Sequence, residues 1–140
     1  MKPALVVDAN VAVGWSADSP NSATCVRILR ESSALIAPDL IIPEVANTFY
    51  QLIRTGTANK ERLRDGLEFL PRWFAELVPS ASLRRRAFDL ALELEHPAYD
   101  CFYLALALSR DVKFVSADGH FLRKASAKGY SGSVSHLEDW

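Results

Sequence analysis

The 140-residue sequence is poor in cysteine, and its two cysteines, Cys25 and Cys101, lie far apart. Two distant cysteines exclude a disulfide-stapled scaffold and a zinc cluster of the CxxC type, and they are typical of a reducing compartment. The amino terminus has no apolar segment of signal-peptide type. No uninterrupted apolar run approaches the ~20 residues of a membrane span. We therefore expect a cytoplasmic protein that does not cross a membrane.

The sequence also has no excess of one charge. Sixteen Lys and Arg residues oppose 17 Asp and Glu residues, so the formal net charge is −1. This balance excludes a protein held on nucleic acid by bulk charge, and any contact with RNA or DNA must come from a local patch. The six Gly and seven Pro are scattered, which excludes collagen-like and low-complexity classes. The length predicts one globular domain over residues 1–140.

Short apolar runs alternate with segments of helical periodicity along the whole chain. Strands are predicted at residues 4–7, 35–37, 74–78, 112–115 and 134–137. Helices are predicted to begin near residues 22, 43, 60, 83, 99 and 119, with ends at Gly56, Leu94, Arg110 and about Lys128. This alternation indicates an α/β fold, with a parallel sheet covered by helices on both faces.

Four acidic residues are flanked in the sequence by apolar residues, unlike the acidic residues on the charged helix faces. Asp8 and Asp118 follow the ends of predicted strands, whereas Glu44 and Asp100 fall in the first turns of predicted helices. The carboxyl ends of parallel strands converge on one crevice, where we expect all four to meet. Two carboxylates ~5 Å apart repel by ~3 kcal/mol at an effective dielectric near 20. Such a cluster must share protons or bind a cation, and all-oxygen ligands favour Mg²⁺ or Mn²⁺ over zinc.

Each of these side chains also has a purely structural interpretation. Asp8 and Asp118 suit the caps of the helices that follow them. Glu44 and Asp100 stabilise a helix dipole from the first turn. The shared placement at one sheet edge favours the functional interpretation of the set. His96, alone before Pro97, is interpreted as a loop residue, with a role as a catalytic base as the alternative.

Four sequence blocks, in order along the chain, resemble PIN domains. VVDANVAV (6–13) resembles the family's opening, where a strand ends in Asp followed two residues later by Ser, Thr or Asn. APDLIIPEVAN (37–47) is similar to the block that supplies the Glu and an Asn. YDCFYLALA (99–107) is similar to the family's "YD…YLALA" helix, and FVSAD (114–118) resembles its closing block. The resemblance is closest to the VapC-like ribonuclease toxins of type II (VapBC) toxin–antitoxin systems.

This resemblance implies a three-layer α/β/α PIN-like fold, with a short central parallel sheet of four to five strands. It implies a Mg²⁺-dependent endoribonuclease, with Mn²⁺ as a substitute, in which metal-assisted hydrolysis cuts RNA. The metal-binding catalytic set that it implies is Asp8, Glu44, Asp100 and Asp118. Asn10 and Ser116 would orient these carboxylates or the phosphate. Ser116 replaces the commoner Thr, and Gly14 stands where many relatives carry Lys; we expect neither to abolish catalysis.

The implied partners are an RNA substrate, a VapB-like antitoxin, and a second copy of the chain in a homodimer and a toxin–antitoxin hetero-oligomer. Arg54 and Lys60, near the loop after the Glu44 helix, are predicted to flank the crevice and bind RNA. The candidate residues of an antitoxin groove are Phe49, Tyr50, Ile53, Leu67 and Phe69.

Three other functions fit part of the pattern. A PIN-like module could bind without turnover, although the complete acidic set favours catalysis. A response-regulator receiver also clusters acids around Mg²⁺, but it needs a Lys at the end of a late strand, where this chain has Ser116, Ala117 and Asp118. A haloacid-dehalogenase-type phosphatase needs a second Asp two residues after the first, and position 10 is Asn.

Overall fold

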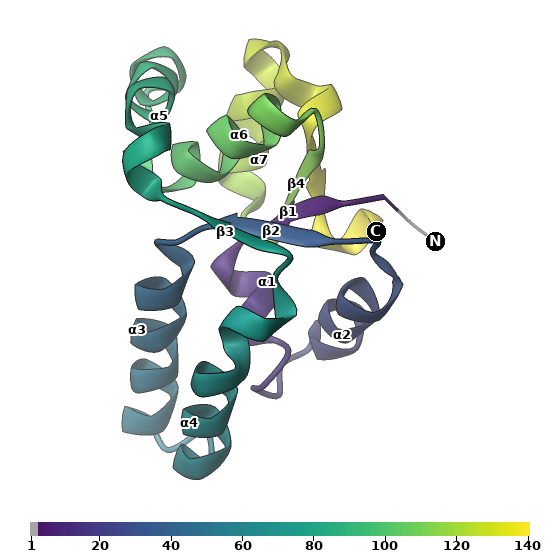
Figure 1. Cartoon of the computed structure of the whole chain (residues 1–140), viewed down its shortest axis with the longest axis vertical. Coiled ribbons are helices and arrows are strands. Elements are labelled where there is room, and N and C mark those ends of the chain that lie inside the picture. Colours follow the sequence, from purple (N-terminus) through teal and green to yellow (C-terminus); the bar gives the residue numbers. More distant parts are fainter. Residues whose placement is uncertain (1–2) are drawn as a thin grey trace.

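The computed structural model describes residues 3–140, which contain one five-stranded sheet. The strand order is β3-β2-β1-β4-β5, and every neighbouring pair is parallel. The strands are β1 (Leu5–Val7), β2 (Leu35–Pro38), β3 (Glu76–Val78), β4 (Lys113–Ser116) and β5 (Val134–His136). The predicted parallel sheet and its five strands are therefore confirmed (Figure 1).

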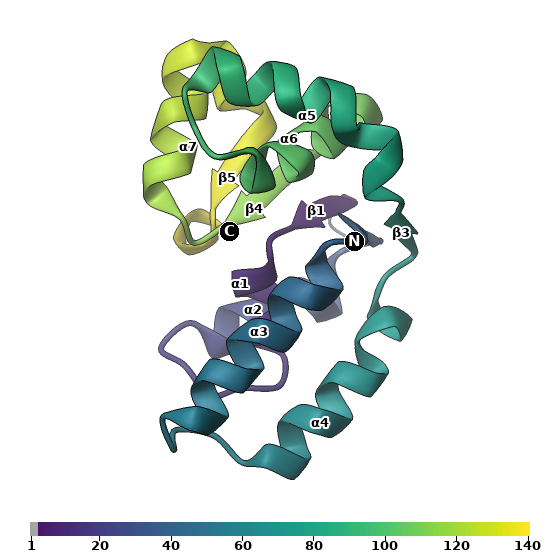
Figure 2. The ribbon, with the colours of Figure 1, turned by 90° about the vertical axis from the view of Figure 1, so that its left-hand side faces the viewer.

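Helices cover both faces of this sheet, which confirms the three-layer architecture. One layer contains α1 (Ala9–Val13), α2 (Ser22–Glu31), α3 (Ile41–Arg54) and α4 (Lys60–Phe69) (Figures 1 and 2). The opposite layer contains α5 (Ser80–Leu94), α6 (Ala98–Arg110) and α7 (Gly119–Ala125). Short 3₁₀ or π turns occupy Leu70–Trp73, Ser126–Tyr130, Ser131–Ser133 and Leu137–Asp139.

The strand predictions succeeded because the burial of the strands matches their apolar runs, whereas two helix starts were wrong. All three residues of β1 and all four of β2 are buried, as expected for strands covered on both faces. Helix α5 begins at Ser80, three residues before the predicted start near Leu83. Helix α3 begins at Ile41, two residues before the predicted start at Pro43. Proline lacks only a backbone donor, and donors in the first turn have no intrahelical partner. Pro43 therefore fits inside the first turn as well as at its start.

Aromatic rings from the helices and strands join the layers. Tyr103 stacks on Phe114 with ring centroids 5.4 Å apart, and Phe114 meets Phe121 edge-on at 6.0 Å. On the other face Trp15 is buried, and its Nε1 donates a 2.9 Å hydrogen bond to the Cys25 carbonyl. A Cβ on Gly14 would lie 2.5 Å from the Cys25 Sγ, so the close approach of α2 explains why this chain has glycine there.

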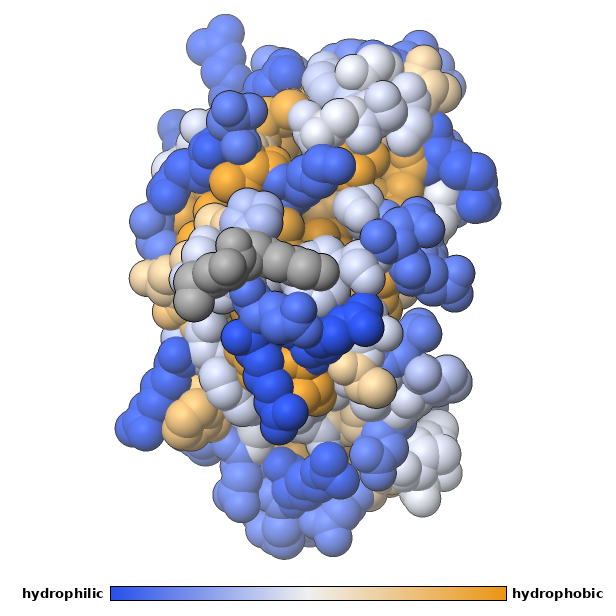
Figure 3. All heavy atoms as spheres, turned by 90° about the vertical axis from the view of Figure 1, so that its right-hand side faces the viewer, coloured by the Kyte–Doolittle hydropathy of each residue, from blue (hydrophilic) through white to orange (hydrophobic). Residues whose placement is uncertain are grey.

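The surface is largely hydrophilic where Figure 3 shows it, with smaller apolar areas between the polar side chains. Within residues 3–140, no helix combines the length and the apolar character that crossing a membrane requires. Cys25 and Cys101 are both buried, and each is a free thiol.

Candidate active site

The structure brings the four predicted carboxylates to the carboxyl edge of the sheet. Asp8 directly follows β1 and caps α1, and Asp118 caps α7 just after β4. Glu44 and Asp100 lie in the first turns of α3 and α6. The charge of Asp100 acts on the carboxyl groups of Asp8 and Glu44, and that of Asp118 acts on Asp100. Asp8 and Asp118 therefore do cap helices, and the charges of the four carboxylates also act on one another. Among the described residues, the ligand atoms that lie within 4.8 Å of one another belong to His96, Asp100 and Asp118.

Asp8 is the most deeply buried of the four, with 6% of its surface exposed. Its Oδ1 accepts a hydrogen bond from the Ala9 amide at 2.8 Å, and its Oδ2 accepts one from the Ser116 hydroxyl at 2.6 Å. Burial raises the pKa of Asp8 to about 7, although the Ser116 bond opposes this shift. The negative charges of Asp100 and Glu44 add to the effect of burial, and the pKa of about 7 includes their contributions. At neutral pH this carboxyl group therefore gains from a proton or a cation.

Asn10 and Ser116, the two predicted orienting groups, form hydrogen bonds between the segments at the carboxyl ends of β1 and β4. The Asn10 Nδ2 lies 3.2 Å from both the Asp8 Oδ2 and the Ser116 Oγ. The Asn10 Oδ1 accepts a hydrogen bond from the Ala117 amide, and the Ser116 Oγ accepts one from the Asp118 amide. This network fixes the orientation of Asp8 relative to the turn that carries Asp118.

Glu44 is held by a residue that we did not identify from the sequence. The Tyr103 hydroxyl, on α6, donates a hydrogen bond to the Glu44 Oε1. Tyr103 is fully buried, and its stacking on Phe114 restricts the ring. Burial raises the pKa of Glu44 and the Tyr103 bond opposes the shift, whereas the Asp100 charge adds to it. The i, i+3 spacing of Asp100 and Tyr103 places both on one face of α6, and this spacing is the feature that could have identified Tyr103.

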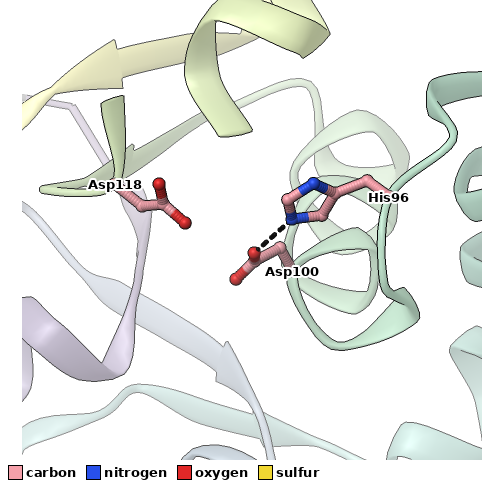
Figure 4. Close-up of side chains that lie close together, drawn as sticks. All are labelled: His96, Asp100 and Asp118. Atoms are coloured by element: carbon pink, nitrogen blue, oxygen red, sulfur yellow. Dashed lines mark hydrogen bonds and ion pairs between the residues drawn. The ribbon is translucent and has the colours of Figure 1, made fainter. Parts of the chain in front are cut away.

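Asp100 contacts His96, which lies in the loop between α5 and α6 as the sequence predicts. The His96 Nε2 lies 2.8 Å from the Asp100 Oδ2, and the His96 side chain is only 9% exposed. Figure 4 shows Asp118 facing Asp100 from the other side. Ligand atoms of His96, Asp100 and Asp118 lie within 4.8 Å of one another. Burial raises the pKa of Asp100 and the His96 bond opposes this, while the charge of Asp118 raises it further.

The hydrogen-bond donors around this cluster include hydroxyls, the Asn10 side-chain amide and backbone amides. Among residues 3–140, no Lys or Arg forms an ion pair with any of the four carboxylates. Neutral donors orient a carboxylate without cancelling its charge, so the repulsion among these carboxylates is left for a proton or an external cation to relieve. Carboxylate oxygens are the ligands that Mg²⁺ and Mn²⁺ take. The side chains present therefore fit a divalent metal ion.

The two predicted RNA contacts are not brought to this cluster. Glu44 lies in the first turn of α3 and Arg54 in its last, so ten residues separate them. At 1.5 Å per residue this is about 15 Å along the helix axis. Figure 2 shows α3 running away from the sheet, with α4 beside it. Lys60 begins α4 and borders an apolar groove between these two helices.

The chain is similar in sequence to proteins that are named as ribonucleases. Over 126 residues the chain is 30% identical to the protein named Ribonuclease VapC1 from two strains of Mycobacterium tuberculosis, a match that covers 89% of this chain and 90% of that protein. It is 31% identical over 125 residues to the protein named Ribonuclease VapC3 from Pyrobaculum aerophilum, covering 88% of this chain and 95% of that protein.

A solved structure supports the fold alone. The crystal structure of PAE2754 from Pyrobaculum aerophilum superimposes with a TM-score of 0.69 at 21% sequence identity, covering 96% of this chain and 84% of that one.

The family model described as PIN domain matches residues 5–127, which include all four carboxylates. Because this match spans most of the sequence and includes every strand except β5, the chain belongs to the PIN domain family.

Proposed function

We propose that this protein is a metal-dependent endoribonuclease that acts in the cytoplasm as the toxin of a VapBC-type pair. The observation that carries the proposal is the cluster of Asp8, Glu44, Asp100 and Asp118, whose charges no Lys or Arg of the described chain neutralises by an ion pair. The relatives named Ribonuclease VapC1 and Ribonuclease VapC3 support RNA as the substrate.

The chain's own residues would hold and orient the metal ligands. Asp8 and Asp100 are the strongest candidates for direct contact, with Glu44 and Asp118 binding directly or through water. When bound, Mg²⁺ or Mn²⁺ would polarise the scissile phosphate as a Lewis acid and lower the pKa of the attacking water. The bonds from Ser116 to Asp8 and from Tyr103 to Glu44 fix one oxygen of each carboxylate. Fixing these oxygens lowers the reorganisation that the reaction requires.

The proposed antitoxin contact is the groove between α3 and α4, with a volume of about 300 Å³. Its lining is mainly apolar, with two cationic residues, and comprises Ala46, Phe49, Tyr50, Ile53, Lys60, Leu63, Arg64 and Leu67. Such a surface fits an amphipathic helix that carries acidic residues along its polar edge. Phe69, which we also expected here, instead packs on Trp73. The toxin would be a homodimer within this complex.

The decisive experiment incubates antitoxin-free protein with total cellular RNA, in Mg²⁺ and in EDTA. The Asp8→Asn variant and the matched Asp65→Asn variant, in which an exposed acid of α4 is replaced, are run beside it. We expect discrete cleavage that needs both the metal and Asp8 and that survives Asp65→Asn. Cleavage by Asp8→Asn equal to that of the unmodified chain would refute the assignment of the site. A folded protein that binds metal but leaves RNA intact would favour a binding module.

A further inference from the structure

His96 occupies a place at the acidic cluster that its position in a loop did not predict. Its ring packs on Phe121, with centroids 4.8 Å apart, and lies 5.9 Å from the ring of His120. The His96 side chain is only 9% exposed. Because the ring is buried and packs on Phe121, few orientations are open to it. The ring therefore directs Nε2 at the Asp100 Oδ2, 2.8 Å away.

The two ring nitrogens of His96 have different surroundings. Nδ1 is buried, and within residues 3–140 it has no hydrogen-bond partner. A hydrogen on Nδ1 would be a buried donor left unpaired, whereas a hydrogen on Nε2 is used in the bond to Asp100. This difference assigns the hydrogen to Nε2. With its hydrogen on Nε2, the ring orients Asp100 through this hydrogen bond.

We propose that His96 is a positioning residue of the candidate metal site: it holds the Asp100 Oδ2, so that the other carboxylate oxygen is presented to the cation. This inference rests on the proposed metal-dependent function and extends it to a residue outside the four carboxylates. Residues that hold a metal ligand in this way contribute strongly to metal affinity. Their loss typically weakens metal binding or activity about 10- to 100-fold. His96 resembles Ser116 and Tyr103, which hold Asp8 and Glu44 in the same manner.

A direct ligand role for His96 is the competing arrangement. His96, Asp100 and Asp118 offer ligand atoms within 4.8 Å of one another, which is close enough for one ion. The same Nε2 would then have to give up its hydrogen and its bond to Asp100. The second nitrogen, Nδ1, is buried away from any partner in the described chain, so it offers no substitute ligand. The observed hydrogen bond therefore favours positioning over coordination.

Titration calorimetry with Mn²⁺ alone tests this role, since it needs no RNA. His96→Leu keeps an apolar side chain against Phe121 but removes the donor. His96→Gln restores a donor near the place of Nε2. His120→Gln is the matched control, because this neighbouring histidine is exposed. We expect His96→Leu to weaken Mn²⁺ binding at least tenfold, and His96→Gln and His120→Gln to stay within about threefold of the unmodified protein. Melting curves without metal confirm that each variant folds.

Two results would overturn the positioning role alone. Affinity retained by His96→Leu would show that Asp100 needs no such partner. Equal loss in His96→Leu and His96→Gln would make His96 a ligand. If the unmodified protein bound no Mn²⁺, the metal site and the role of His96 would both fail. Absence of RNA cleavage with normal Mn²⁺ affinities would count against the proposed nuclease and leave His96 in place.

Discussion

The buried Asp8 carboxyl group makes a quantitative prediction about the stability of the metal-free protein. Burial, with the charges of Asp100 and Glu44 adding to it, raises the folded-state pKa of Asp8 from 3.8 to about 7. The folded protein therefore binds more protons than the unfolded chain between these values. The stability that protonated Asp8 contributes is present below the unfolded pKa and is lost as pH rises through the folded pKa.

The size of this loss follows from proton linkage. With pKa values of 3.8 unfolded and about 7 folded, the free energy of unfolding falls by about 2.5 kcal/mol between pH 5 and pH 8. Asp8→Asn removes this titration. The difference in free energy of unfolding between variant and unmodified protein should therefore move by about 2.5 kcal/mol in favour of the variant over that range. Any constant cost of replacing the hydrogen bonds to Ala9 and Ser116 cancels in this comparison.

Urea unfolding in EDTA, followed by tryptophan fluorescence at pH 5, 6, 7 and 8, measures this difference. Asp65→Asn is the control, because it removes an exposed acid of α4, and its curve should run parallel to that of the unmodified protein. The titration of Glu44 and Asp100, whose pKa values burial also raises, remains in both proteins. If the curves of Asp8→Asn and the unmodified protein stayed parallel from pH 5 to pH 8, the reasoning about a buried, electrostatically strained Asp8 would be refuted.

Three further predictions concern the metal and the core. Mn²⁺ at 100 times its Kd should stabilise the unmodified protein by about 2.7 kcal/mol, which a thermal shift assay detects as a rise in melting temperature. The same Mn²⁺ concentration should raise the melting temperature of Asp100→Asn by less than half as much. An equal rise in both proteins would exclude a shared site. Phe114→Ala should lower the free energy of unfolding by about 3–5 kcal/mol, because the ring is fully buried between Tyr103 and Phe121; a loss below about 1 kcal/mol in urea unfolding would contradict this packing. Trp15→Phe should cost about 1 kcal/mol through the lost bond to the Cys25 carbonyl, and an unchanged urea midpoint would show that this bond contributes nothing.

Local sequence patterns predict most of the strands and helices of the fold. A strand covered on both faces needs a continuous apolar run, and an amphipathic helix needs apolar residues at helical spacing, so both are visible without knowledge of distant contacts. The placement of Asp8 after β1 and of Glu44 in the first turn of α3 is likewise predictable from the local sequence. The sequence predicts the start of α3 only to within two residues, because Pro43 is compatible with several positions in a first turn.

Partnerships between distant residues depended on the tertiary structure. Tyr103 and Glu44 are 59 residues apart, and they meet because α6 and α3 both begin at the same edge of the sheet. His96 was interpreted from its loop alone, although the packing of Phe121 directs its ring at Asp100. Arg54 was expected near the crevice because it follows the Glu44 helix, but a rigid helix carries its last turn away from its first.

The sequence by itself determined which residues form strands and helices, and that four carboxylates stand at strand ends and helix starts. Only the tertiary structure decided that β1 lies between β2 and β4, which places Asp8 beside Ser116 and the turn to Asp118. The physical reason is that periodicity reports the environment of each residue along its own element. The order of strands and the partners of polar side chains depend instead on how whole elements pack together.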